Sequence, residues 1–213
     1  LPKYAFNGCT SLHTITCSNV KTINNNCFTS CTNLATITFP NLEIIGDNVF
    51  SGIETIIEID FPKVTSVGTS SFQDCKGLNK VVLNSCTTVG MTAFYGCVVL
   101  SVVEIPKLKT LYCCSFRNTN VENVEFLLLD TLNLCTIDGT NNVGGYFMNC
   151  QNLKSFKAPL AKYLRRNMFS GCTSLSELSM DEAISIDPNC FYNCIALNRL
   201  ILPKVTSISK SLF

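Results

Sequence analysis

The chain has 213 residues, of which 46 % are hydrophobic, and its mean hydropathy is +0.28. This composition supplies ample material for a core and excludes a disordered chain. Sixteen Lys and Arg residues oppose fifteen Asp and Glu residues, so no summed positive field is available to neutralise phosphates, and nucleic acid is not expected as a partner.

The beginning of the chain and its apolar runs bear on targeting. Leu1–Ala5 has neither a basic nor an apolar segment, so no signal peptide can be read, and we expect a removed signal or an excerpt from a longer array. Apolar runs such as Phe126–Leu129 are far shorter than the roughly 18 residues that cross a bilayer, so membrane insertion of this segment is not expected.

Phenylalanine recurs along the chain at a fixed interval of 22 residues, with one interval of 31 between Phe116 and Phe147. A fixed period of about 20 to 50 residues is typical of solenoids and other stacked arrays. We therefore expect residues 1–213 to form a single solenoid of about nine coils. Each coil is numbered by its phenylalanine, in the order Phe6, Phe28, Phe50, Phe72, Phe94, Phe116, Phe147, Phe169, Phe191 and Phe213.

Each coil repeats the same apolar positions after its phenylalanine. In coil two these positions are Cys31, Leu34, Ile37 and Phe39, and two further apolar rows close the coil. Ile37 and Phe39 alternate as in a strand with one buried face, and the proline that often follows ends the strand. One short parallel strand per coil is therefore predicted. The Phe-x-x-Cys segment, rich in Asn, Ser and Gly, predicts a helical or 3₁₀ turn on the opposite side.

The segment Phe28–Ile45 spells Phe-x-x-Cys-x-x-Leu-x-x-Ile-x-Phe-Pro-x-Leu-x-x-Ile. It resembles the BspA-like, Treponema-type subclass of leucine-rich repeats, which has about 22–23 residues per repeat. The resemblance covers essentially the whole chain. It implies an α/β solenoid wound as a right-handed superhelix, in a surface-exposed protein that engages host proteins or other cells.

Seven of the fourteen cysteines occupy one repeat position, three residues after phenylalanine. We expect them to be buried as small apolar residues, because stacked parallel side chains have poor geometry for disulfides. The sole histidine, His13, lacks a partner set for zinc, so no metal or other cofactor is expected. The redox state of the other cysteines, and hence the compartment, stays open. The seven are Cys9, Cys31, Cys75, Cys97, Cys150, Cys172 and Cys194.

The sequence contains no strong pattern of catalytic residues. His13 flanks a strand in the first coil, far from a plausible triad, and Gly144-Gly145 is not followed by the Lys-Ser/Thr of a phosphate loop. Glu58 and Asp60 share one strand face, but a solvated surface explains them better than acid–base chemistry. A carbohydrate-active enzyme would need such a pair beside aromatic platforms, which the sequence does not show. We therefore predict that the chain is not an enzyme.

The outward strand positions are the candidate binding surface, because solenoids commonly bind partners on their strand-lined face. These rows lack aromatic residues, so they are expected to form part of a larger site, and a solvated face without a partner stays the alternative. The candidate ligand-binding residues are Glu58, Asp60, Lys80, Glu104, Glu125, Lys157, Glu177 and Arg199.

Coil six departs from the repeat. Thr119 replaces the cysteine, one residue is lost before Val121, and about ten residues are inserted near 133–142. The insertion predicts a surface loop, which is either a binding loop or a tolerated insertion. Leu127 and Leu128 would form an apolar patch if both are exposed.

The leading functional hypothesis is an adhesion or recognition module, on the cell surface or secreted, with a host or extracellular-matrix protein as partner. The alternative is a cytoplasmic scaffold that organises other proteins. Reduced cysteines, the missing signal peptide and the absence of an Asn-x-Ser/Thr acceptor favour this alternative. Exposed strand edges at the two ends also predict end-to-end self-association.

Overall fold

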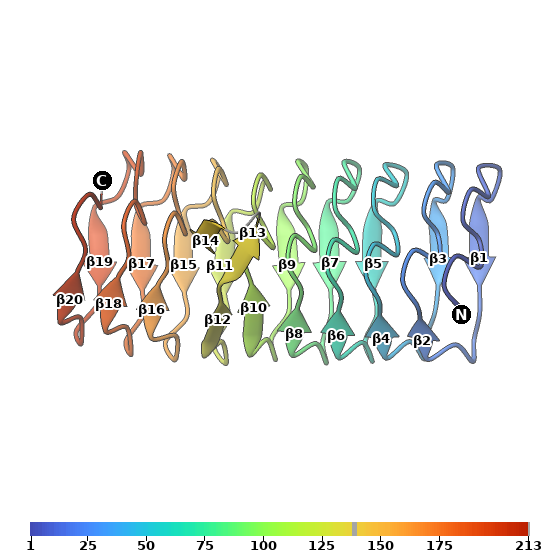
Figure 1. Ribbon diagram of the computed structural model, residues 1–213, viewed down its shortest axis with the longest axis horizontal. Coiled ribbons are helices and arrows are strands. Elements are labelled where there is room, and N and C mark those ends of the chain that lie inside the picture. Colours follow the sequence, from blue (N-terminus) through green and yellow to red (C-terminus); the bar gives the residue numbers. More distant parts are fainter. Residues whose placement is uncertain (138–139, 213) are drawn as a thin grey trace.

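The computed structural model describes residues 1–137 and 140–212. They form a β-solenoid in which 22-residue coils stack side by side along one axis (Figure 1). Each regular coil supplies one three-residue strand to one face and a strand of two or three residues to a second face. A single coil cannot bury its apolar rows alone, so the stacking of neighbours creates the core.

The three-residue strands lie at the predicted positions and pair in parallel, one coil apart, as in the pairing of Ile59 with Val81. We call this surface the strand face. Its strands are β1 (Thr14–Thr16), β3 (Thr36–Thr38), β5 (Glu58–Asp60), β7 (Lys80–Val82), β9 (Val102–Glu104), β11 (Asn123–Glu125), β15 (Ser155–Lys157), β17 (Glu177–Ser179) and β19 (Arg199–Ile201).

A second parallel sheet, which the sequence analysis did not predict, runs along the coils. It forms because the last apolar row of each coil, as at Ile23 and Ile45, points inward from a short extended segment. Its strands are β2 (Thr22–Ile23), β4 (Ile44–Ile45), β6 (Ser66–Val67), β8 (Thr88–Val89), β10 (Thr110–Tyr112), β12 (Thr131–Asn133), β16 (Tyr163–Leu164), β18 (Ser185–Ile186) and β20 (Ser207–Ile208).

The predicted helical or 3₁₀ turns are absent from the described residues. The Phe-x-x-Cys segment instead forms hydrogen-bonded turns, such as the bond from the Cys31 N–H to the Phe28 carbonyl at 3.0 Å. Asn26 precedes this turn with φ of 58°, and Ser30 lies within it with φ of 63°. A helix needs consecutive residues with negative φ, so a left-handed residue every four positions prevents it from forming. The fold is therefore all β rather than α/β.

Two ladders run through the core. The phenylalanines stack nearly parallel, with ring centroids 5.2–6.0 Å apart in successive coils. Beside them, each buried ladder cysteine donates its thiol proton to the carbonyl of the phenylalanine one coil earlier, over 3.0–3.1 Å. These cysteines are Cys31, Cys75, Cys97, Cys150, Cys172 and Cys194.

The cysteines differ from the expectation in two respects. Cys9, at the ladder position of the first coil, is exposed rather than buried. Cys113, outside the ladder, is disulfide-bonded, whereas the six buried ladder cysteines carry free thiols. Burial raises the pKa of these thiols, to about 12 for Cys75.

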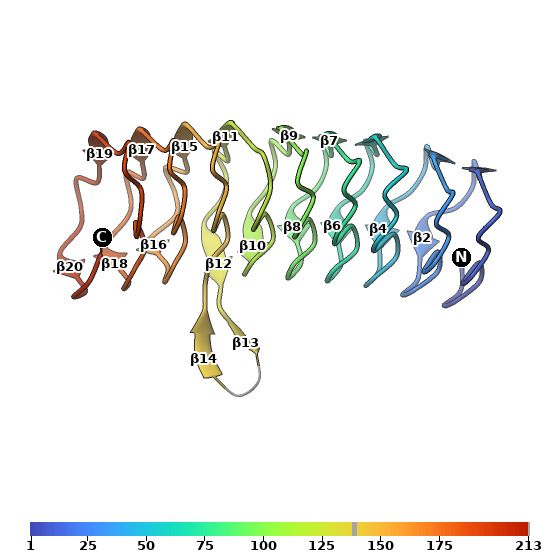
Figure 2. The ribbon, with the colours of Figure 1, turned by 90° about the horizontal axis from the view of Figure 1, so that it is seen from above.

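The insertion in coil six contains an antiparallel hairpin of β13 (Cys135–Ile137) and β14 (Thr140–Val143). Figure 2 shows it projecting from the side of the solenoid opposite the strand face. Residues 138 and 139 of the predicted loop lie outside the described residues. Leu127 and Leu128 are both exposed, as the predicted apolar patch requires.

Neither sheet is continuous, and their interruptions are staggered. The strand face is interrupted between β3 and β5 and between β9 and β11, where the second sheet continues from β2 to β12. The second sheet is interrupted between β12 and β16, where β11 pairs with β15 on the strand face. Coil six is thus joined to coil five through one sheet and to coil seven through the other.

Candidate functional site: a groove in the strand face

The strand face opens between coils five and six. No ladder joins β9 to β11 in the described part of the chain, and Figure 1 shows these strands further apart than β7 and β9. The opening coincides with the residue lost between Thr119 and Val121, in the turn that leads into β11. The Asn120 N–H bonds to the Leu100 carbonyl at 3.0 Å, and beyond this contact the two strands separate.

One edge of the opening belongs to β9. The Val102 N–H bonds back to Asn79 of coil four, and the Glu104 carbonyl accepts from Leu83 at 2.9 Å. Successive residues of a strand direct their backbone groups to opposite sides. The N–H and C=O of Val103 and the N–H of Ile105 are therefore directed toward β11.

The other edge belongs to β11. The Phe126 N–H bonds to the Lys157 carbonyl at 2.9 Å, so the alternate residues Val124 and Phe126 face β15. By the same alternation, the backbone groups of Asn123 and Glu125 are directed toward β9. The opening is thus bordered on both sides by strand edges.

A groove of about 670 Å³ extends from this opening over β11, β15 and β17. Val103 is only partly buried there, whereas Val81, at the same position one coil earlier, is fully buried. The groove is lined by Asn84, Val103, Glu104, Ile105, Pro106, Asn123, Val124, Glu125, Ser155, Phe156, Lys157, Glu177 and Ser179. It therefore combines a partly apolar floor with a charged rim.

Ion pairs cross between neighbouring strands in and beside the groove. They join Lys157 to Glu125 at 2.9 Å, Arg199 to Glu177 at 3.1 Å and Lys80 to Glu104 at 3.6 Å. The hydrogen bond to Glu125 raises the pKa of the Lys157 ammonium group. Because all these side chains are largely exposed, the pairs contribute little to stability and stay accessible to a partner.

The structure brings together four of the eight predicted binding residues. Glu104, Glu125, Lys157 and Glu177 line the groove. Lys80 and Arg199 contact two of these carboxylates from the adjoining strands. Glu58 and Asp60 lie on β5, which does not border the groove.

Sequence reasoning missed the groove itself and the contributions of Asn84 and Pro106, which lie in the turns after β7 and β9. The available signal was the residue lost before Val121. It shows an irregular coil, but it does not show which ladder would open.

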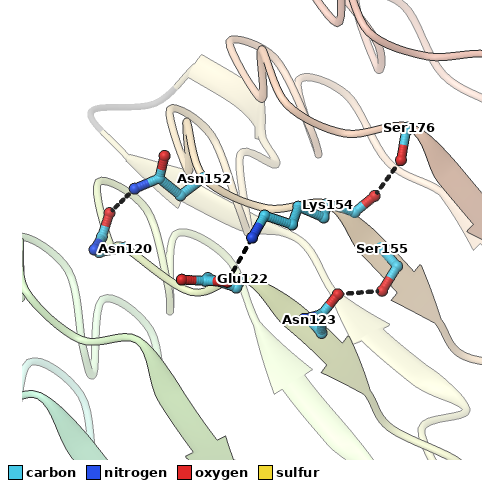
Figure 3. Close-up of polar contacts among 7 residues, drawn as sticks. All are labelled: Asn120, Glu122, Asn123, Asn152, Lys154, Ser155 and Ser176. Carbon is cyan, nitrogen blue, oxygen red and sulfur yellow. Dashed lines mark hydrogen bonds and ion pairs between the residues drawn. The ribbon is translucent and has the colours of Figure 1, made fainter.

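Side-chain hydrogen bonds hold coil six against coil seven where the groove passes from β11 to β15 (Figure 3). The Lys154 ammonium donates to Glu122 at 2.7 Å, and the Ser155 hydroxyl donates to Asn123 Oδ1 at 2.8 Å. The Ser176 hydroxyl in turn donates to the Lys154 carbonyl at 3.1 Å. On this face β11 is therefore fixed to the coil that follows it and separated from the coil that precedes it.

A second, smaller cleft lies at the turn that precedes β11, with a volume of about 420 Å³. In it Asn152 donates to Asn120, as Figure 3 shows, and Asn149 donates to Asn118 at 3.1 Å. The cleft is lined by Val98, Asn118, Thr119, Asn120, Asn149, Gln151 and Asn152. These amides link coils six and seven beside the shortened turn.

Among the side chains that the structure describes, no three His, Cys, Asp or Glu residues are arranged to hold a metal ion. The described part of the chain contains no helix that is long and apolar enough to cross a membrane.

A family model described as the BspA type leucine rich repeat region matches residues 1–125 and 137–213, in six copies. The chain belongs to the BspA-type leucine-rich-repeat family. Between the two matched segments lie residues 126–136, in the irregular coil. Among curated protein sequences, none matches this BspA-type chain.

Solved structures share the fold of this BspA-type chain. A leucine-rich repeat protein from Bacteroides ovatus has a TM-score of 0.51 at 17 % identity, with 98 % of this chain and 77 % of that one covered. The pneumococcal vaccine antigen PcpA has a TM-score of 0.53 at 14 % identity, with coverage of 92 % and 69 %. At these identities the likeness establishes the fold alone.

Proposed function

We propose that the chain is a non-catalytic protein-binding module whose strand face, centred on the groove between β9 and β11, is the binding surface. Membership of a repeat-scaffold family supports protein binding. The observation that carries the choice of surface is the groove, where apolar floor residues and charged side chains lie in one concave site. Concave sites that combine apolar area with a few polar groups are the usual binding sites of proteins.

The rim suits a protein partner. Lys157 and Glu125 carry opposite charges on exposed side chains, so a partner's charges can exchange with the existing ion pairs and fix its register. The rim lacks the aromatic anchors of tight interfaces, so the affinity depends on what the floor and backbone of the groove contribute.

We further propose that the module acts on the cell surface or after secretion, with a host or extracellular-matrix protein as its partner. Cys113 is disulfide-bonded, and disulfides persist mainly in oxidising compartments. One protein with this fold is named a pneumococcal vaccine antigen.

A photoreactive amino acid at the groove tests the binding surface. It would replace Ser155 in one variant and Ser66, on the second sheet, in a matched control, since both are partly buried strand serines. We expect crosslinks to purified extracellular-matrix proteins or intact host cells from position 155 and not from position 66. Equal crosslinking from both positions, or none from either, would contradict the proposal.

A cytoplasmic scaffold is the second candidate, favoured by the exposed free thiol of Cys9. Thiol titration of protein purified without reductant separates the two. If Cys113 stays unreactive after denaturation, the oxidising compartment is supported. If every cysteine reacts, the cytoplasmic scaffold is the better hypothesis.

A further inference from the structure

We propose that the groove receives an extended polypeptide segment of the partner, with aliphatic and basic side chains in alternation, which adds a strand to the open edges of β9 and β11. This inference rests on the proposed function and specifies the partner's conformation and chemistry. It is carried by the backbone groups at the opening, by the shape of the groove and by its charge.

The backbone groups are paired at one junction of the strand face and unpaired at the next. Between β7 and β9, the backbone groups that face each other are bonded across the ladder. Between β9 and β11, the corresponding groups of Val103, Ile105, Asn123 and Glu125 have no such ladder. An open strand edge is a template for another strand, and strand addition is an established mode of peptide recognition.

The apolar floor of the groove is the reason for expecting aliphatic side chains in the bound peptide. Val103 and Val124 project from β9 and β11 at the base of the groove, and Val103 is only partly buried. In an added strand every second side chain points toward this floor. Small aliphatic side chains at those positions would bury apolar area that now contacts water.

The carboxylates at the groove are the reason for expecting basic side chains in the bound peptide. The groove lining contains Glu104, Glu125 and Glu177 but only one cation, Lys157. Lys80 and Arg199 contact two of these carboxylates from outside the lining and are themselves exposed. The outward side chains of an added strand pass between Glu104 of β9 and Glu125 of β11, where Lys or Arg is complementary and Glu or Asp is repelled.

A variant with the opening closed provides the matched control. Insertion of one serine after Asn120 restores the spacing of the regular coils and is expected to let β11 pair with β9. Slower amide hydrogen exchange at Val103, Ile105, Asn123 and Glu125 would show that the ladder has closed.

The probe is a displayed library of random linear peptides, selected on the wild-type chain. We expect the enriched peptides to alternate aliphatic with Lys or Arg residues and to bind the closed variant at least about tenfold more weakly, equal to about 1.4 kcal/mol. The double substitution Glu104→Gln and Glu125→Gln, which keeps the groove open, should weaken the same peptides. Failure to enrich any peptide would overturn the inference.

A scan of N-methylated versions of one enriched peptide tests strand addition without relying on the closed variant. N-methylation removes one backbone donor at a time, so binding should fall at every second position and persist at the positions between. If binding is insensitive to methylation, or falls without alternation, strand addition is wrong. The groove then still stands as a binding surface if crosslinking from position 155 succeeds, so the two proposals fail separately.

Discussion

Cysteine acts in this core as a hydrogen-bond donor as well as an apolar residue. Each buried ladder thiol bonds to a phenylalanine carbonyl of the preceding coil, such as Cys97 to Phe72 at 3.0 Å. Thr119, which replaces the cysteine in coil six, instead bonds within its own coil, from its hydroxyl to the Phe116 carbonyl at 2.8 Å. Ile53 occupies the same position in coil three and is buried without a donor, so the position requires a buried side chain and the thiol hydrogen bond adds to this packing.

Substitution of a ladder cysteine tests this role. Cys97→Ala is expected to lower the free energy of unfolding by about 1–3 kcal/mol, because it leaves a cavity and an unpaired buried carbonyl. Cys97→Ser keeps a donor and should cost less. Urea unfolding measures both, with Cys9→Ala at the exposed position as a control of about 0.5 kcal/mol or less. Equal losses for Cys97→Ala and Cys9→Ala would refute the role.

The buried thiols also predict a pH dependence of stability. The pKa of Cys75 rises from 9.0 to about 12 and that of Cys86 to about 11, chiefly through desolvation. The native state thus keeps thiol protons that the unfolded chain releases above pH 9. The stabilisation is fully present below pH 9 and is lost as the pH rises through 11–12. Urea midpoints measured below and above pH 9 should show this fall, and Cys75→Ser should reduce it.

At the residue scale, the spacing of the cysteines was enough to predict the burial of six of the seven ladder residues. It was not enough to predict their thiol hydrogen bonds, because repeat spacing carries no information on rotamers or carbonyl positions. The disulfide state of Cys113 had no signal, since its spacing matches no disulfide or metal pattern.

At the scale of elements, the three-residue strands followed from alternation, whereas the second strands and the absence of helix did not. Two-residue strands are too short for a periodic signal. The Ser and Asn residues that suggested helix starts instead adopt positive φ, as Asn48 and Ser70 do at 52° each. Such residues favour both caps and left-handed turns, so only the backbone distinguishes the two.

Two glycines occupy their positions for different reasons: Gly68 allows two coils to approach closely, and Gly52 adopts a left-handed backbone conformation. A Cβ on Gly68 would lie 2.5 Å from the backbone of Gly46 in the preceding coil, so Gly68→Ala should cost about 1–3 kcal/mol of stability. Gly52 has φ of 74° and open space around it. Asn118 and Asn149 occupy the same repeat position with positive φ, so Gly52→Asn should leave stability nearly unchanged. Thermal unfolding compares the two, and similar losses would contradict this reading.

At the scale of the whole molecule, the period and the family were readable from sequence because every coil restates the same apolar rows. Four of the eight candidate binding residues converge in the groove, since outward strand positions follow from alternation. The groove could not be predicted, because repeat spacing does not show where a ladder is interrupted: the ladder between β3 and β5 is interrupted although the period there is a regular 22 residues.

The interruption on one face alone predicts an uneven pattern of amide hydrogen exchange at the junction of coils five and six. The N–H groups of Val103 and Asn123, at the open edges, should exchange rapidly. The Thr131 N–H, bonded to the Lys109 carbonyl at 3.0 Å on the second sheet, should be protected. Exchange measured residue by residue by NMR checks this, and uniform protection across both faces would show that the strand face is closed in solution.

The staggered interruptions have a mechanical consequence. A rod pulled along its axis parts where the bonds between adjacent sections are fewest. Within residues 1–137 and 140–212, each gap in one sheet is bridged by an unbroken ladder in the other, and the phenylalanine stack continues through coil six. Because the gaps in the two sheets are offset, tension at a gap in one sheet is carried by the hydrogen-bonded ladder of the other. The solenoid thus keeps an opening on one face without being weakened across its full cross-section.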